Sequence, residues 1–314
     1  MSVDRPADSA PLPLPPAAAP PASVAQVVAA RTSDLGGFTV RRALPVAGLR
    51  TVQPRMVGPF IFFDHMGPAF FDAGQGLDVR PHPHIGLATL TYLLEGEIMH
   101  RDTLGNAIAI RPGEVNLMTA GRGIAHSERT GEASRSAGQK LHGLQCWLAL
   151  PATHEEMAPA FAHHGAAEFQ ELTDTGVRQR VVVGRWGGVT SPVATATDTL
   201  FVDATLSAGA SMALDADHEE RAVYLVSGVI EIQGDRFEEA QLLVLRPGDR
   251  LRLKAVTDAK LVALGGAVMD GPRHIWWNFV SSRKDRIETA KADWRNGSFP
   301  LVPGDETEFI PLPA

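Results

Sequence analysis

Cysteine is almost absent from this sequence. The single Cys146 cannot form a disulfide within the chain, which excludes a disulfide-stabilised secreted scaffold and favours a reducing compartment. No apolar run reaches the roughly 18 residues that a membrane-spanning helix needs. Basic residues are not in excess, since 29 Lys and Arg stand against 36 Asp and Glu and give a net charge of −7. We therefore expect a cytoplasmic protein that binds neither nucleic acid nor membrane directly.

Glycine and proline are abundant, with 30 and 23 residues in a chain of 314. Such usage is typical of many short elements joined by turns, and the length predicts two domains. Residues 1–30 are dominated by Pro and Ala, with only Asp4, Arg5 and Asp8 charged, so they predict a disordered tail. We place an N-terminal domain at residues 31–155 and a C-terminal domain at residues 156–314.

Both domains consist of short apolar runs of strand length, bounded by turn residues. The runs are 87–94, 107–110, 115–118, 144–150, 181–183, 200–202, 222–226, 229–233, 242–245 and 261–264. One helix is expected over 282–294, because Ile287, Ala290 and Trp294 share a face and Asn296-Gly297 follows as a stop. Residues 151–174 are expected to form an irregular, partly helical connection. The pattern predicts an all-β protein of sandwiches or barrels with a short C-terminal helix.

Two short segments of the first domain are echoed in the second. Residues 92–96 (YLLEG) resemble 224–228 (YLVSG), and residues 110–114 (IRPGE) resemble 245–249 (LRPGD). The two matches occur in the same order and at nearly the same offset. They predict a duplicated β-domain.

Histidines are concentrated in the first domain, and four residues there have a metal-ligand pattern. His82 and His84 are two residues apart, as are His126 and Glu128. Side chains at this spacing project to the same face of a strand. Two such pairs would bring three nitrogens and one carboxylate to a common point, a mixed set that suits a divalent transition metal and leaves positions open for water, O₂ or substrate. A lone His-x-His pair is more often structural, but two pairs at the edges of expected strands favour a metal site.

Around these ligands the sequence resembles the pirin family of the cupin superfamily. Gly76, His82-Pro83-His84 and Gly96 resemble the first cupin motif, and Pro112-Gly113 with His126 resembles the second. The run 80–128 is similar to pirin throughout, as are the segments 60–67 (FIFFDHMG), 144–151 (LQCWLALP) and 276–287 (WWNFVSSRKDRI). The resemblance covers roughly residues 38–300.

The resemblance implies two tandem cupin barrels (double-stranded β-helix, or jelly-roll) with one metal ion in the N-terminal barrel. Its ligand pattern falls on His82, His84, His126 and Glu128, and the metal implied is Fe²⁺, although Mn, Co, Ni, Cu or Zn suit the same ligands. Some relatives resemble quercetin 2,3-dioxygenases, which open a flavonol ring with O₂, and Glu128 is then also the candidate catalytic base. Others are regulators that bind a protein partner, and this remains the alternative function.

Two positions depart from the family pattern. The usual cupin motif has a glutamate where Ala88 stands, and pirins often have an arginine where Ile85 stands. Both changes alter the charge expected beside the metal. The four ligands themselves are retained.

The second barrel is expected to hold no metal. Aligning the repeats places Leu214 and Ala216 opposite His82 and His84. It places Leu261 and Ala263 opposite His126 and Glu128. The nearby His218 lies in a charged stretch and is expected to be exposed to solvent.

Five further residues are candidates for contacts around the metal or with substrate. They are His65, His100, Arg101, Asp102 and Arg122. For each, a structural hydrogen bond or ion pair is the alternative. Cys146 lies beside Trp147 in an apolar run and is expected to be buried.

Overall fold

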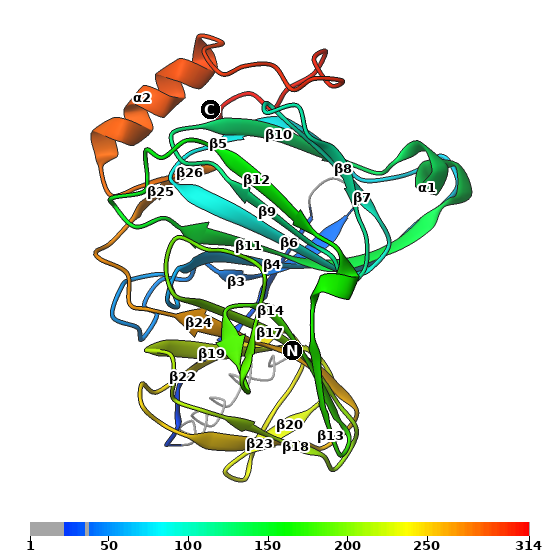
Figure 1. Cartoon of the computed structure of the whole chain (residues 1–314), viewed down its shortest axis with the longest axis vertical. Coiled ribbons are helices and arrows are strands. Elements are labelled where there is room, and N and C mark those ends of the chain that lie inside the picture. The colour runs from blue at the N-terminus through cyan, green and yellow to red at the C-terminus, as the bar shows by residue number, and fades with distance from the viewer. Residues whose placement is uncertain (1–21, 35–37, 314) are drawn as a thin grey trace, which may run out of the picture.

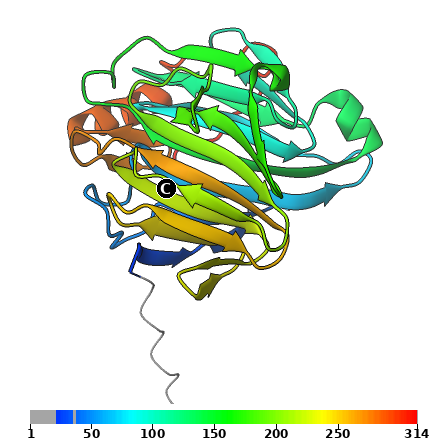
Figure 2. The ribbon, with the colours of Figure 1, turned by 60° about the horizontal axis from the view of Figure 1, so that its bottom comes forward.

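The computed structural model describes residues 22–34 and 38–313. It consists of two β-barrels, each formed by a seven-stranded and a four-stranded sheet, stacked one above the other (Figure 1). A second view shows the same stacking, with helix α1 (Glu132–Ala137) projecting from the edge of the N-terminal barrel (Figure 2). The predicted all-β class with a short C-terminal helix is confirmed. None of the helices in the described ranges is long and apolar enough to cross a membrane.

The N-terminal barrel is formed by the strands between Arg31 and His164. Its seven-stranded sheet contains, in spatial order, β12 (Ala160–His164), β9 (Val115–Thr119), β6 (Leu87–Glu95), β11 (Gln139–Ala149), β4 (Phe60–Phe71), β3 (Thr39–Leu44) and β2 (Arg31–Asp34). Its four-stranded sheet contains β5 (Asp78–His84), β10 (Ile124–Arg129), β7 (Ile98–Asp102) and β8 (Ala107–Ile110).

The C-terminal barrel repeats this plan. Its seven-stranded sheet contains β1 (Val24–Ala29), β22 (Gln241–Leu245), β19 (Glu220–Ser227), β24 (Ala259–Gly266), β17 (Thr199–Leu206), β14 (Val177–Val183) and β13 (Glu171–Asp174). Its four-stranded sheet contains β18 (Ser211–Leu214), β23 (Leu251–Ala255), β20 (Ile230–Ile232) and β21 (Asp235–Phe237). A two-stranded hairpin pairs β15 (Arg185–Trp186) with β16 (Val189–Thr190), and a 3₁₀ turn, η1 (Ala166–Glu168), precedes β13.

The two barrels exchange their first strands. Strand β1 precedes the N-terminal barrel but pairs with β22 of the C-terminal one, whereas β12 precedes the C-terminal barrel and pairs with β9 of the N-terminal one. The predicted disordered tail over residues 1–30 is therefore wrong for residues 24–29, where Val24 and Val28 are buried and the backbone is held by β22. Residues 1–21 of that predicted tail lie outside the described residues. The connection 151–174 is likewise more ordered than expected, because it contains β12 and β13.

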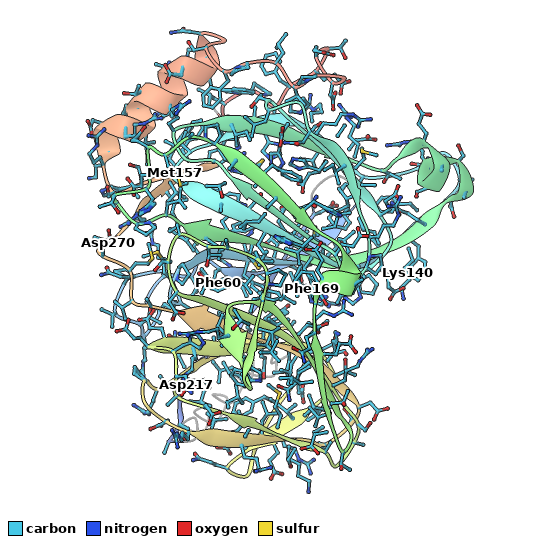
Figure 3. All side chains as sticks on the ribbon, in the orientation of Figure 1. Phe60, Lys140, Met157, Phe169, Asp217 and Asp270 are labelled. Atoms are coloured by element: carbon cyan, nitrogen blue, oxygen red, sulfur yellow. The ribbon has the colours of Figure 1, made fainter. Side chains whose placement is uncertain are left out.

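An apolar layer fills the space between the two seven-stranded sheets. Along β6 and β19 every second side chain enters it, including Tyr92 and Tyr224, and Phe60 and Phe169 lie in the same layer (Figure 3). The expected burial of Cys146 in this layer is confirmed. The alternate residues of the same strands point into their own barrels.

The end of the chain returns to cover the N-terminal barrel. Strands β25 (His274–Trp276) and β26 (Phe279–Ser281) form a hairpin, and helix α2 (Lys284–Arg295) follows it across the face formed by β5 and β10 (Figure 1). Ile287 and Ala290 of α2 are buried as expected and cluster with Ile85 of the N-terminal barrel. Gly297, with a φ of 70°, ends the helix where the stop signal lies.

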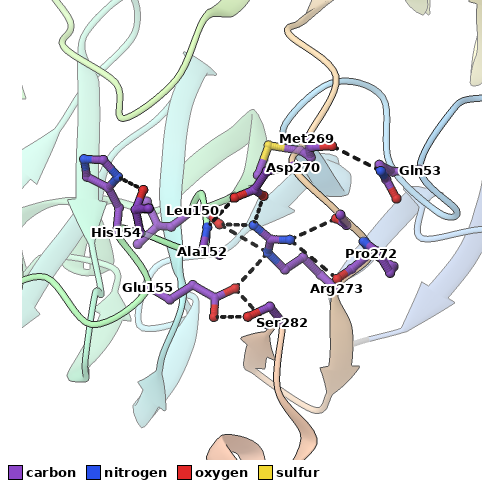
Figure 4. Close-up of polar contacts among 12 residues, drawn as sticks. Gln53, Leu150, Ala152, His154, Glu155, Met269, Asp270, Pro272, Arg273 and Ser282 are labelled. Carbon is purple, nitrogen blue, oxygen red and sulfur yellow. Dashed lines mark hydrogen bonds and ion pairs between the residues drawn. The ribbon is translucent and has the colours of Figure 1, made fainter.

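A buried ion pair fixes this hairpin. Arg273 is paired with Glu155 at 2.8 Å and donates two hydrogen bonds to the carbonyl of Leu150 (Figure 4). Glu155 also accepts hydrogen bonds from the backbone and hydroxyl of Ser282 and from the hydroxyl of Ser281. Both charged side chains are almost fully buried. Arg273 also pairs with Asp270, whereas Glu155 depends on Arg273 for charge compensation.

Candidate metal centre

Two neighbouring strands bring three histidines together. In the antiparallel pairing of β5 with β10, His126 lies opposite His82, and Ile124 lies opposite His84. The spacing of two residues turns all three imidazoles toward the barrel interior, where their exposed fractions are only 7%, 1% and 1%. One nitrogen from each ring lies within 4.8 Å of the others. The sequence-predicted convergence of His82, His84 and His126 is therefore present.

Backbone carbonyls orient two of the rings. The Nδ1 of His82 lies 2.9 Å from the carbonyl of Arg80, and the Nδ1 of His84 lies 3.2 Å from the carbonyl of Asn278. Because a carbonyl only accepts, both Nδ1 atoms must carry the proton, and each Nε2 keeps a free lone pair. The Nε2 of His84 lies 3.1 Å from the Nε2 of His126. A lone pair directed at another ring nitrogen in the buried interior of the barrel suits a cation, so the residues fit a divalent metal.

Burial also keeps the three rings in the form that binds metal. It lowers the pKa of His82, and it lowers the pKa of His84 and His126 well below the ordinary histidine value, with the neighbouring imidazoles adding to the effect. For His82 the nearby Glu128 carboxylate partly opposes this shift. Neutral imidazole is the ligand form, so no proton has to leave these rings at neutral pH.

Glu128 lies beside the three histidines but is turned toward another partner. It is buried, and it lies opposite His100 in the pairing of β10 with β7. Its Oε1 accepts a 2.7 Å hydrogen bond from the side-chain amide of Gln145 on β11. In the described part of the chain, the set of ligand atoms within 4.8 Å of one another consists of the three histidines without Glu128.

Of the other candidates, only His100 contacts the histidine cluster. Its ring lies 5.2 Å from that of His126, with 3.4 Å between the two Nδ1 atoms. Arg101 points the other way and lies near Gly304 of the C-terminal segment. Arg122 is exposed, and its carbonyl accepts a hydrogen bond from Arg286.

His65 lies in the contact between the two barrels. Its Nδ1 is 3.1 Å from the hydroxyl of Tyr224, and its Nε2 is 2.7 Å from the Nε2 of His142. The aromatic segment around His65 faces this layer, which explains why the residue is buried without reaching the three histidines. Burial lowers the pKa of His65 to about 3.

The second barrel has apolar residues at the corresponding positions. In the pairing of β18 with β23, Leu214 lies opposite Leu251 and Met212 lies opposite Leu253, which repeats the register of β5 with β10. The positions of His82, His84, His126 and Glu128 are therefore taken by Met212, Leu214, Leu253 and Ala255.

This register corrects the sequence alignment of the repeats. Leu214 corresponds to His84, and the predicted counterparts Ala216, Leu261 and Ala263 occupy other positions. The error arises because Pro112-Gly113 precedes β9, whereas Pro247-Gly248 follows β22, the strand that corresponds to β9.

His218 is also placed differently from expectation. It is buried rather than exposed, and it pairs with Asp198 at 2.8 Å and with the carbonyl of Arg185. It is thus a structural histidine of the C-terminal barrel.

Two contributors to the site were missed from the sequence, whereas Asp102 was among the candidates and pairs with His100. Gln145 interrupts an apolar strand at an inward position, so it left a signal. Asn278 contributes a backbone carbonyl, for which a side-chain pattern gives no signal.

Within the described residues, two stacked barrels with a histidine cluster in the first alone define a bicupin with one candidate metal centre. A pirin family model matches residues 37–148, and a pirin C-terminal cupin model matches residues 201–300. A pirin-like protein of Caulobacter vibrioides is 49% identical over 90% of this chain and 97% of its own length. This chain belongs to the pirin family.

Other relatives carry names that refer to flavonol chemistry. A protein of Pseudomonas aeruginosa, provisionally named a quercetin 2,3-dioxygenase, is 39% identical over 87% of this chain and 84% of its own length. The crystal structure of a quercetin 2,3-dioxygenase from Acinetobacter baumannii is 33% identical, with a TM-score of 0.83 over 92% of this chain and 95% of that one. A bacterial pirin from Escherichia coli, solved with nickel(II), shares the fold at 20% identity, with a TM-score of 0.59 over 78% of this chain and 99% of that one.

Proposed function

We propose that this protein is a mononuclear metal-dependent dioxygenase acting on a flavonol-type substrate. The observation that carries the proposal is the convergence of three buried imidazoles in the barrel of a chain similar to proteins named quercetin 2,3-dioxygenase. We assign His82, His84, His126 and Glu128 as ligands of one divalent ion and propose Fe²⁺. The site also accepts Mn, Co, Ni, Cu or Zn in principle, because imidazole and carboxylate suit them all.

The charge of the ligands favours an anionic substrate. When bound, the ion would supply a Lewis-acidic centre that binds O₂ and a chelating substrate. Three neutral imidazoles and one carboxylate leave such a centre with net positive charge, which attracts a deprotonated flavonol or enediol. The buried rings exclude water, and the backbone carbonyls of Arg80 and Asn278 hold two of them in place.

Glu128 is proposed to have a second role as the catalytic base. Its Oε1 is held by Gln145, and its other carboxylate oxygen would accept the hydroxyl proton of the substrate. His100 is the one further candidate placed to act on the cluster. The surroundings of His65, Arg101 and Arg122 support structural roles for those three residues.

The alternative function is that of a metal-dependent regulator with a protein partner. One observation favours it: the histidines are closed off, and His84 is bonded to Asn278 in the hairpin that the C-terminal segment lays over the barrel. Metal binding would then change how firmly His84 binds this hairpin and, through it, how α2 packs on the barrel. A cytoplasmic location is proposed for either function, on the basis of the single buried cysteine.

Metal analysis combined with O₂ uptake separates the two functions. The protein is loaded with Fe²⁺ without oxygen, desalted, and mixed with O₂ and a panel of flavonols. The dioxygenase proposal predicts about one metal per chain and O₂ uptake that depends on the flavonol. Bound metal without O₂ uptake on any flavonol would overturn the dioxygenase and favour the regulator.

Replacing a ligand tests the assignment itself. His84→Ala should abolish metal binding and leave the fold intact, because the hydrogen bonds of the His84 ring are with other site groups. The matched control is His154→Ala, since His154 is exposed and bonds only to neighbouring groups. Full metal stoichiometry in His84→Ala would show that the ligand assignment is wrong.

A further inference from the structure

We propose that Asp102 and His100 are positioning residues that fix the proton of His126, so that its Nε2 faces the metal. The inference deepens the proposed function and rests on the metal site assigned there. Two contacts in series carry it. The Nε2 of His100 lies 3.1 Å from the Oδ2 of Asp102, and the Nδ1 of His100 lies 3.4 Å from the Nδ1 of His126. The side chains of Asp102, His100 and His126 are all buried, with exposed fractions of 0%, 4% and 1% respectively.

The direction of both hydrogen bonds follows from Asp102. Its carboxylate accepts from the backbone of Leu104 at 2.9 Å and from the backbone and side-chain amide of Asn106. Asp102 is therefore a carboxylate that only accepts, and the Nε2 of His100 must donate to it.

The proton of His126 is then determined. With its proton on Nε2, neutral His100 presents a lone pair at Nδ1. His126 donates its Nδ1 proton to that lone pair, which leaves the Nε2 of His126 unprotonated beside the Nε2 of His84. Without His100, His126 could instead carry its proton on Nε2 and donate it to His84 across their 3.1 Å separation, which would occupy the metal position.

An aromatic neighbour helps to hold the ring of His100 in the orientation that these hydrogen bonds need. The ring of His100 stacks on Phe161 at 4.6 Å with an interplanar angle of 18°. Phe161 belongs to β12, the strand that the N-terminal barrel receives from the start of the C-terminal domain. The exchanged strand thus supports the group that orients His126.

The second barrel shows that the fold does not require these residues. Ile230 and Ile232 lie opposite Ala255 and Leu253, and so take the positions of His100 and Asp102. Both isoleucines are fully buried in an apolar interior. The polar pair is therefore found in the barrel that has histidines to orient.

Two substitutions of His100 test the proposal, with Co²⁺ as the probe and a chromophoric chelator as competitor. His100→Leu removes the acceptor for His126 and should weaken Co²⁺ binding about 10–100-fold, the usual range for an outer hydrogen-bond partner of a ligand. His100→Asn places an amide oxygen near the former Nδ1 and should restore most of the affinity. His163→Asn is the matched control, because His163 bonds to Asn116 away from the cluster, and it should leave the affinity unchanged.

A second readout does not depend on metal. ¹⁵N NMR of the metal-free protein should show His126 protonated at Nδ1 in the wild type and in His100→Asn. In His100→Leu, protonation at Nε2 should appear, while thermal unfolding confirms that the variant folds. Equal Co²⁺ affinity and the same His126 tautomer in His100→Leu would overturn the inference. If the wild type bound no Co²⁺, the proposed function would fail, and the tautomer measurement would still decide the role of His100.

Discussion

The two barrels have the same strand order, but their interiors differ in polarity. Between the sheets of the C-terminal barrel lies a continuous apolar cluster that includes Leu214, Leu225 and Leu253. The corresponding space in the N-terminal barrel contains the three histidines, together with the polar residues that hold them. The apolar barrel is thus the reference that shows which residues the fold needs.

The comparison shows that the shared fold alone does not account for the polar interior. A buried polar group costs free energy unless it is hydrogen-bonded. In the C-terminal barrel (barrel two; the N-terminal barrel is barrel one), the matching positions hold apolar residues and so carry no such cost. Gln145 has Ala263 as its counterpart, since Thr91 lies opposite Gln145 as Val223 lies opposite Ala263 in the paired strands. The N-terminal barrel therefore contains a hydrogen-bonded network that the C-terminal barrel, with the same strand order, lacks at the matching positions.

The largest expected effect comes from giving barrel one a residue of barrel two. His126→Leu introduces the side chain found at Leu253 and removes one of the three converging nitrogens. We expect metal affinity to fall at least about 10³-fold, or about 4 kcal/mol, with the fold retained. Isothermal titration with Co²⁺ measures the affinity and circular dichroism the fold. Unfolding of the variant would contradict the view that the two interiors are interchangeable.

A second difference between the barrels is that the C-terminal hairpin covers barrel one. Breaking the buried ion pair that holds this hairpin tests how much the hairpin contributes to stability. Arg273→Met leaves the carboxylate of Glu155 buried without its charge partner, which should cost about 3–5 kcal/mol of unfolding free energy. Urea denaturation measures the loss. Arg283→Met is the control, because its pair with Asp285 is exposed and such pairs contribute about 0–1 kcal/mol. Equal losses in both variants would show that the hairpin is not held by Arg273.

A cavity in barrel two should affect stability without affecting metal binding. Leu253 is fully buried, so Leu253→Ala should lower the free energy of unfolding by about 2–5 kcal/mol. Co²⁺ stoichiometry should stay the same as in the wild type. A loss of metal in this variant would mean that the two interiors are coupled.

The contact between the barrels should respond to pH through His65. Its pKa is lowered by burial to about 3, so the unfolded chain binds a proton near pH 6.5 that the folded chain does not. The stability from this residue is complete above pH 6.5 and is lost as the pH falls toward 3. His65→Gln should flatten the stability profile in this window by up to about 1.4 kcal/mol per pH unit. Urea denaturation at several pH values measures the slope; identical slopes would contradict the shift.

The smallest effect is expected at Gln145. Gln145→Met removes the hydrogen bond that holds Glu128 and brings barrel one closer to the apolar state of barrel two. Co²⁺ affinity should change by about tenfold, or about 1.4 kcal/mol. Glu128→Gln in the same assay shows whether the carboxylate itself binds the metal. If Glu128→Gln has full affinity, the three histidines bind without Glu128.

Local patterns in the sequence predicted the histidine cluster well. The spacing of two within a strand was enough to bring His82, His84 and His126 together, because the side-chain period of a strand is geometric. The YLLEG repeat was also a true one, since Gly96 and Gly228 end the corresponding strands β6 and β19. Both inferences depend only on neighbouring residues.

Features that depend on distant partners were predicted poorly. Strand β1 is ordered by β22, more than 200 residues away in the sequence, so the composition of residues 24–29 alone suggested a tail. The Pro-Gly turns of the two halves matched by chance, because such turns suit any strand end. The role of Asn278 could not be read either, since any residue could supply its carbonyl.

Metal content per chain tests the central claim most directly. The wild-type protein is loaded with excess Fe²⁺ without oxygen, desalted, and analysed for iron and protein by mass spectrometry and amino-acid analysis. If barrel one binds a metal ion and barrel two binds none, the protein should contain about one ion per chain. Two ions per chain, or none, would contradict it.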